Sequence, residues 1–206
     1  QNGIETIDVL ISVLGKRNIL GGTCRIISKI IAPGIIQHTG VEPFLTFGEL
    51  NNEHTSRIKN IHNLFRDAGI KARIASDIYS DIWEKFAFMA SWSGLGAATR
   101  ASVGIIRSLP ETRKLLVDSI NEILSLGRAN GINLDPSLSQ RIIDFIDNLP
   151  EHGTSSMQRD IMADLPSELE AHNGAVVKLG KKLNFPTPIN DFIYSILLPT
   201  ELKARG

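Results

Sequence analysis

The stretch DIYSDIWEKFAFMASW, residues 77–92, decides the fold of this chain because it reads as a helix that is apolar over most of its circumference. At about 100° per residue, the surface neighbours of Lys85 are almost all apolar, and Asp81 is the only other charge among them. A helix of this kind is buried, so three interpretations of Lys85 stay open. The side chain extends along its stem to solvent, pairs with Asp81, or lies in a cleft where a desolvated amine has chemical use. Periodicity alone favours the first.

The composition is that of an ordinary globular protein and excludes several classes. The 206 residues suffice for a sizeable core, in one large or two small domains. The 22 basic and 22 acidic residues cancel, without a block of like charges, which argues against a nucleic-acid or membrane-surface partner. Cys24 is the only cysteine, which fits the cytoplasm, and no apolar run is long enough to cross a bilayer. The chain starts at Gln1 rather than at Met, so we expect a further segment upstream.

Two kinds of periodicity divide the chain near Ser76. Residues 1–76 combine two helical patterns with β-rich runs, whereas only helical patterns follow, and no linker separates the two parts. The sequence therefore predicts a mainly α protein with a small α/β portion in front of an all-helical block. The expected helices before residue 76 span 4–14 and 55–68, and the expected strands span 19–32, 35–39, 44–48 and 71–75.

No familiar cofactor or metal motif is visible. The stretch 94–99, GLGAAT, has the spelling of a dinucleotide loop but follows a helix rather than a strand, so we expect a sharp turn between helices there. The five histidines show no metal-ligand spacing, and we expect no metal site. Cys24 is interpreted as a small buried apolar residue.

Two polar clusters remain in the helical part. One is Ser155 to Asp160, and the other is Glu168, which shares a helix face with His172. Loop and helix-capping roles account for most of these residues. Asn173-Gly174 inside a helix is different, because a mid-helix glycine costs roughly 1 kcal/mol and usually permits close packing or close ligand approach.

Taken together, these motifs resemble the ketopantoate reductase (2-dehydropantoate 2-reductase) family, in family order and over nearly the whole chain. The motifs are Gln1-Asn2-Gly3, Pro33-Gly34 with His38-x-Gly40, Trp83-Glu84-Lys85-Phe86, Ser155-Ser156-Met157-Gln158-x-Asp160, Glu168, Asn173-Gly174 and Thr187-Pro188-Ile189-Asn190. The resemblance implies that residues 1–76 are the end of an NADPH-binding Rossmann domain whose glycine-rich half is missing. It implies that residues 77–206 are a helical substrate and catalytic domain like the C-terminal domain of 6-phosphogluconate dehydrogenase.

The resemblance also assigns roles to four residues. Lys85 matches the catalytic lysine that gives a proton to the ketone oxygen, a role for which a cation in a water-poor cleft is suited. Asn2 matches the asparagine that orients lysine and substrate near the nicotinamide, and so touches both substrate and cofactor. Ser156 matches a contact of the substrate carboxylate, and Glu168 matches a carboxylate that hydrogen-bonds a substrate hydroxyl.

The expected activity is NADPH-dependent reduction of 2-dehydropantoate in the cytoplasm, with the given chain inactive by itself and a homodimer as the expected assembly. The sequence departs from the family where Met89, Ser93 and Gly153 replace common asparagines. Met89 cannot offer the hydrogen bonds of an amide, so an alternative is a relative that reduces a different 2-oxo acid. A second alternative, from another class, is a non-catalytic helical module for dimerisation.

Overall fold

The computed structural model describes residues 2–38, 40 and 42–206, and the described part is mainly helical, as the sequence predicts. Gln1 and Thr39, which belong to predicted motifs, lie outside the described residues. The chain divides into two compact units, one made of residues 6–82 and the other of residues 2–5 with 83–206. The division falls inside the helix that carries Lys85.

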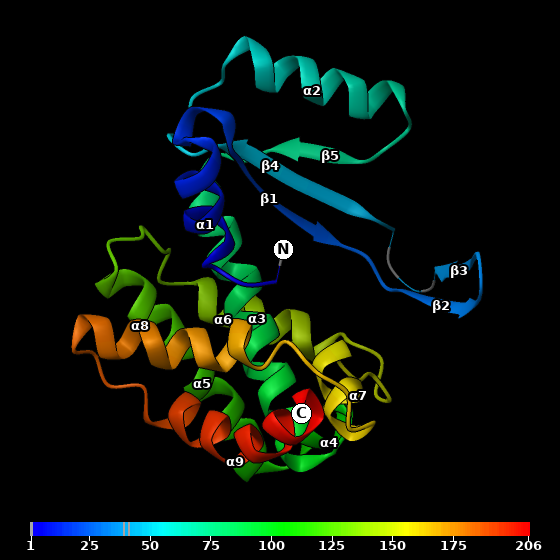
Figure 1. Cartoon of the computed structure of the whole chain (residues 1–206), viewed down its shortest axis with the longest axis vertical. Helices are drawn as coiled ribbons and strands as arrows, with labels where there is room; N and C mark the ends of the chain where they lie inside the picture. Colours follow the sequence, from blue (N-terminus) through cyan, green and yellow to red (C-terminus); the bar gives the residue numbers. More distant parts are fainter. Residues whose placement is uncertain (1, 39, 41) are drawn as a thin grey trace. The chain divides into compact units, whose positions relative to one another are not determined.

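The first unit contains a three-stranded sheet, a separate hairpin and two helices (Figure 1). In the sheet, β4 pairs antiparallel with β1 (Leu20 opposite Glu49) and parallel with β5 (Leu45 opposite Ala72). The elements are α1 (Thr6–Leu14), the 3₁₀ turn η1 (Lys16–Asn18), β1 (Leu20–Arg25), β2 (Ser28–Ala32), β3 (Ile35–His38), β4 (Phe44–Glu49), α2 (Ser56–Asp67) and β5 (Ala72–Ile74). The predicted strand at 19–32 is thus two strands, the second of which pairs with β3 in the hairpin.

Helix α2 covers one face of this sheet (Figure 1). It begins at the predicted position because the Thr55 side chain accepts a hydrogen bond from the Ile58 amide. The ring of Phe65 packs edge-on against Phe47 of β4, at 5.2 Å between centroids. The Ile78 side chain packs against the other face of the sheet, where a β-carbon at Gly21 of β1 would lie 2.5 Å from it.

The second unit is helical and is built around α3 (Ile78–Thr99) from Trp83 onward. Its core joins the buried face of α3 to α5 and α6, through side chains such as Phe86, Ile120 and Ile146. The remaining elements are α4 (Val103–Ser108), α5 (Pro110–Ala129), α6 (Leu138–Asp147), α7 (Ser156–Met162), the π-helical turn η2 (Glu170–Gly174), α8 (Ala175–Leu183) and α9 (Pro188–Arg205).

The predicted turn at Gly94 and Gly96 is wrong, because α3 continues through both glycines to Thr99. Their function is close packing. A β-carbon at Gly94 would lie 2.7 Å from Asn173 Oδ1, and one at Gly96 would lie 2.5 Å from Gln158 Oε1. The glycines therefore admit two polar side chains from other parts of the helical unit against α3.

Candidate active site around Lys85

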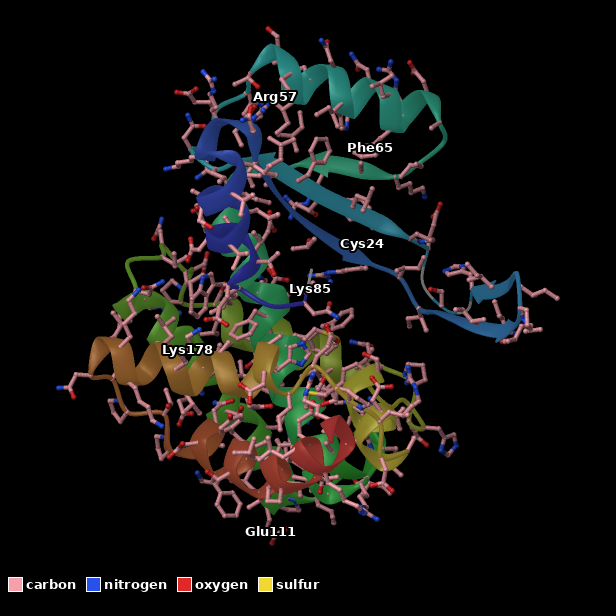
Figure 2. All side chains as sticks on the ribbon, viewed as in Figure 1. Cys24, Arg57, Phe65, Lys85, Glu111 and Lys178 are labelled. Atoms are coloured by element: carbon pink, nitrogen blue, oxygen red, sulfur yellow. The ribbon has the colours of Figure 1, made fainter. Side chains whose placement is uncertain are left out.

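Helix α3 holds Lys85 at the border between core and solvent. Trp83 and Phe86, on either side of it in sequence, are buried and meet edge-on at 5.7 Å between ring centroids. Lys85 itself is half-buried, and so is Met89 one turn further along the helix. Figure 2 labels Lys85 on α3. The lysine stem is therefore partly removed from water, as the apolar pattern predicts for a residue on this helix.

The predicted residues Asn2 and Glu168 contact each other although 166 positions separate them. The Asn2 Nδ2 atom donates to Glu168 Oε2 at 3.1 Å and to Oε1 at 3.3 Å. Residues 2–5 belong to the helical unit, and Lys178 of α8 donates to Glu5 Oε1 at 2.6 Å. The N-terminal segment thus lies along the segment that carries Glu168.

A π-helical turn follows Glu168 and places His172 inside the unit. The Gly174 amide donates to the Leu169 carbonyl at 3.0 Å, which is the i to i−5 pattern of such a turn. His172 is fully buried, and neither of its ring nitrogens has a hydrogen-bond partner among the described residues. Single π-helical turns are frequent at functional sites.

Two of the predicted site residues, Glu168 and Lys85, act electrostatically on His172. Burial lowers the pKa of His172 from 6.5 to about 4; the Glu168 carboxylate opposes this shift and the Lys85 ammonium adds to it. Both charges act on one imidazole, and Glu168 also accepts from Asn2. Asn2 thus contacts Glu168, and both Glu168 and Lys85 are close enough to His172 for their charges to act on its pKa.

Ser156 stands apart from this group in its hydrogen bonding. It is the half-buried first residue of α7, whose N-terminus is capped by the Ser155 hydroxyl accepting from the Gln158 amide at 3.0 Å. No hydrogen bond among the described residues joins Ser156 to Asn2 or Glu168. Its predicted contact with a substrate carboxylate stays a prediction.

The three departures from the family pattern differ in their surroundings. Met89 is half-buried beside Lys85, whereas Ser93 is fully buried and its hydroxyl has no partner in the described part of the chain. Gly153 lies where a β-carbon would be 3.0 Å from the Pro150 carbonyl oxygen. An asparagine at 153 would therefore need the loop backbone to shift. Met89 and Gly153 are both partly exposed, whereas Ser93 is not.

His172 is the residue of this site whose importance the sequence analysis missed. The spacing of Glu168 and His172 put them on one helix face, but helix capping explained that face equally well. The interpretation of Asn173-Gly174 is confirmed as close packing, because a β-carbon at Gly174 would lie 2.9 Å from Glu170 Oε2. Asn173 Nδ2 donates to Asn190 Oδ1 at 2.9 Å and to the Ala90 carbonyl at 3.4 Å, which ties η2 to α9 and α3.

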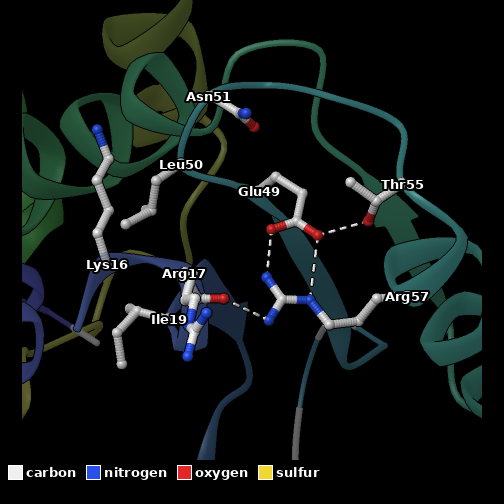
Figure 3. Close-up of a pocket in the computed structure, with 8 residues that line it drawn as sticks. All are labelled: Lys16, Arg17, Ile19, Glu49, Leu50, Asn51, Thr55 and Arg57. Atoms are coloured by element: carbon white, nitrogen blue, oxygen red, sulfur yellow. Dashed lines mark hydrogen bonds and ion pairs between the residues drawn. The ribbon is translucent and has the colours of Figure 1, made fainter. Parts of the chain in front are cut away.

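A hollow of about 550 Å³ lies in the first unit and is a separate feature (Figure 3). Its polar centre is Glu49, which accepts from Arg57 Nε at 3.1 Å and from the Thr55 hydroxyl at 2.5 Å. The Arg57 guanidinium holds the pKa of Glu49 below its ordinary value, against the effect of burial. Because Arg57 also donates to the Arg17 carbonyl at 2.7 Å, this group joins β4, α2 and η1 as a structural ion pair.

Comparisons with known proteins show the family to which this chain belongs. The family model described as ketopantoate reductase PanE/ApbA C terminal matches residues 77–201, and the model ketopantoate reductase PanE/ApbA matches residues 1–52. The uncharacterized oxidoreductase YkpB of Bacillus subtilis is 30% identical over 198 residues, covering 95% of this chain and 65% of the relative. The chain thus spans about two thirds of that relative's length.

Two solved structures have a similar fold. The 2-dehydropantoate 2-reductase of Geobacter metallireducens is 25% identical in sequence. The match covers 97% of this chain and 66% of the Geobacter chain, with a TM-score of 0.87. The D-mandelate dehydrogenase structure with NADH and anilino(oxo)acetate is 20% identical in sequence, and the match covers 100% of this chain and 67% of that one. Its TM-score is 0.88, and at this identity the likeness is one of fold alone.

These similarities place the chain in a class of oxidoreductases with an all-helical C-terminal domain. The chain belongs to the ketopantoate reductase PanE/ApbA family, because a family model matches more than half of its length. The resemblance and the mainly α fold predicted from the sequence are both confirmed. No helix in the described ranges is both long and apolar enough for a membrane span.

Proposed function

We propose that the full-length protein reduces a 2-oxo acid with NADPH, and that 2-dehydropantoate, giving pantoate, is the substrate. The observation that carries the proposal is the contact of Asn2 with Glu168, together with the action of the Glu168 and Lys85 charges on one imidazole, in the helical unit of a ketopantoate reductase family member. Each of the three offers a polar group suited to a 2-oxo acid with a hydroxyl substituent. We retain residue 76 as the proposed boundary between cofactor and catalytic domains.

In this proposal Lys85 acts on the ketone oxygen. Negative charge develops on that oxygen as the carbonyl carbon is reduced, and an ammonium in a partly desolvated position both stabilises the charge and supplies the proton. Glu168 accepts a hydrogen bond from the substrate hydroxyl, and Asn2 fixes the Glu168 carboxylate through the contacts at 3.1 and 3.3 Å. Ser156 is the proposed partner of the substrate carboxylate.

The one stretch with the spelling of a dinucleotide loop, residues 94–99, does not form such a loop in the described structure. The glycines of 94–99 lie inside α3, and the spaces beside Gly94 and Gly96 are filled by Asn173 and Gln158 side chains. We therefore place the phosphate-binding part of the cofactor site outside these 206 residues, with Asn2 as the contact that this chain supplies. The chain alone should bind NADPH poorly and show no reductase activity.

The test uses the complete coding sequence that contains this chain. Oxidation of NADPH and NADH is followed at 340 nm with 2-dehydropantoate as substrate, for the wild type, Lys85→Ala and the control Lys203→Ala, an exposed lysine of α9. Loss of the proton donor should lower kcat/KM by more than about tenfold, equivalent to roughly 1.4 kcal/mol, whereas the control should match the wild type. A smaller loss in Lys85→Ala would show that the acid role is wrong.

Met89 favours a second candidate, reduction of a different 2-oxo acid. Its half-buried thioether lies one turn from Lys85 where the family commonly has an amide, so that part of the site offers apolar contact in place of hydrogen bonds. A panel of 2-oxo acids with branched or aromatic substituents would decide between the two. A strong preference for 2-dehydropantoate, unchanged in Met89→Asn, would remove this candidate.

The non-catalytic alternative, a helical dimerisation module, makes a different prediction. It requires self-association of this chain, which gel filtration at high concentration measures directly. A monomeric elution volume at every concentration tested, together with reductase activity of the complete protein, would exclude it.

A further inference from the structure

His172 presents a chemical problem that its role in the fold does not solve. Its ring is fully buried, and neither Nδ1 nor Nε2 has a hydrogen-bond partner among the described residues. Burying an unsatisfied polar group costs roughly 1 to 3 kcal/mol, and native proteins leave few such groups without a reason. An apolar side chain at this position would avoid the cost, so the imidazole calls for an explanation beyond packing.

The surroundings of the ring suggest what its nitrogens are for. A neutral imidazole has one N–H donor and one nitrogen acceptor. The two charges that act on His172 are the Glu168 carboxylate, which only accepts, and the Lys85 ammonium, which only donates. The ring thus has one group suited to each of its charged neighbours.

We propose that His172 is a positioning residue that links Glu168 to Lys85 through one bridging water on each side, donating from one ring nitrogen toward the carboxylate and accepting at the other from the side of the ammonium. This inference rests on the proposed reductase function and deepens it. The link would hold the lysine head group toward the carbonyl to be reduced and keep it protonated. His172 touches neither substrate nor cofactor in this role.

The backbone around His172 is built to hold the ring in place. The π-helical turn puts both His172 and Asn173 inside the unit, and Asn173 is anchored to Asn190 and to the Ala90 carbonyl. Anchoring of the next residue fixes the direction of the imidazole without using its nitrogens. A side chain kept only for packing would not need both nitrogens left open.

The ring remains neutral while it performs this role. Burial and Lys85 lower the pKa of His172 to about 4, so the ring carries no charge near pH 7. Other acidic groups on neighbouring elements are occupied elsewhere. Glu170 accepts from the Tyr194 hydroxyl at 2.6 Å, and Glu122 of α5 accepts from the Asn190 amide at 3.0 Å. His172 therefore acts as a fixed dipole rather than as an acid.

The experiment compares His172→Gln, which keeps one donor and one acceptor without a titratable ring, with His172→Leu, which keeps the bulk and removes both. In the complete protein, the pH profile of kcat/KM is measured together with the titration midpoint of the Lys85 ammonium, followed by NMR of ¹³C-labelled lysine. His172→Leu should lower kcat/KM by about tenfold or more and move the Lys85 midpoint to lower pH by roughly one unit. In His172→Gln, both kcat/KM and the Lys85 midpoint should lie close to their wild-type values.

Three results would overturn the link. One is an unchanged Lys85 midpoint in His172→Leu, and another is a His172→Gln variant as impaired as His172→Leu. The third is a loss of thermal stability in His172→Leu with an unaltered pH profile, which would mean that the ring serves packing alone. The midpoint does not depend on turnover, so a protein without reductase activity would refute the proposed function while the midpoint still decides the link.

Discussion

Acidification should destabilise the helical unit through His172 between pH 6.5 and about pH 4. The pKa of His172 falls from 6.5 in the unfolded chain to about 4 in the folded protein, mainly because burial disfavours the charged ring. The unfolded state therefore binds a proton more readily than the folded state does. The contribution of His172 to the free energy of unfolding is fully present well above pH 6.5. It decreases as the pH falls below that value and is lost by about pH 4.

The size of the effect follows from the difference of 2.5 pKa units between 6.5 and about 4. At about 1.4 kcal/mol per unit, the total is about 3 kcal/mol, of which about 2 kcal/mol is lost between pH 7.5 and pH 5.0. The lower limit of pH 5.0 matters, because Arg57 and Arg113 lower the pKa values of Glu49 and Asp147, and the stability from those pairs is lost only at more acidic pH.

Urea unfolding at pH 7.5 and 5.0 measures this loss. Both tryptophans, Trp83 and Trp92, belong to the unit that contains His172, so their fluorescence reports on the relevant transition. The wild type should lose about 2 kcal/mol more than His172→Leu, while His152→Leu, the same change at an exposed histidine, should behave like the wild type. Equal losses in the wild type and His172→Leu would refute the reasoning, because the buried ring would then not be the group that binds the proton.

Three further changes test the packing that supports the site, each by urea unfolding at pH 7.5. Gly94→Ala should destabilise by about 1 to 3 kcal/mol although alanine is the better helix former, because its β-carbon meets Asn173; a gain in stability would show that Asn173 moves aside freely. Glu122→Ala should cost about 2 kcal/mol, since its carboxylate accepts from the Ile189 and Asn190 amides at the start of α9, and an unchanged midpoint would contradict that cap. Ser155→Ala should cost about 1 kcal/mol through loss of the α7 cap, with Ser155→Asn close to the wild type.

Most of the fold could be predicted because hydrophobic period and local capping act over a few residues. Gly15 and Gly131 follow helices at positive φ, as their places in the sequence suggest, and Thr55 caps α2. The continuation of α3 through Gly94 and Gly96 could not be predicted. Whether a glycine ends a helix or admits a neighbour depends on what packs against it, and Asn173 and Gln158 come from 79 and 62 residues further along the chain.

The site was predictable to the extent that it resembles a family, and the physical reasoning from periodicity left Lys85 ambiguous. The apolar helix around residue 85 explains why the lysine stem is half-buried, but it does not say which groups face the ammonium. In the structure the charges of Lys85 and Glu168 both act on His172, which lies in a π-helical turn that has no reliable sequence signal. An extra residue in one turn shifts every later side chain around the helix axis, so the α-helical spacing from Glu168 to His172 does not by itself predict that His172 and Asn173 both point inward. Regular α-helix in place of that turn would rotate Asn173 about the helix axis, away from its hydrogen bonds with Asn190 and the Ala90 carbonyl.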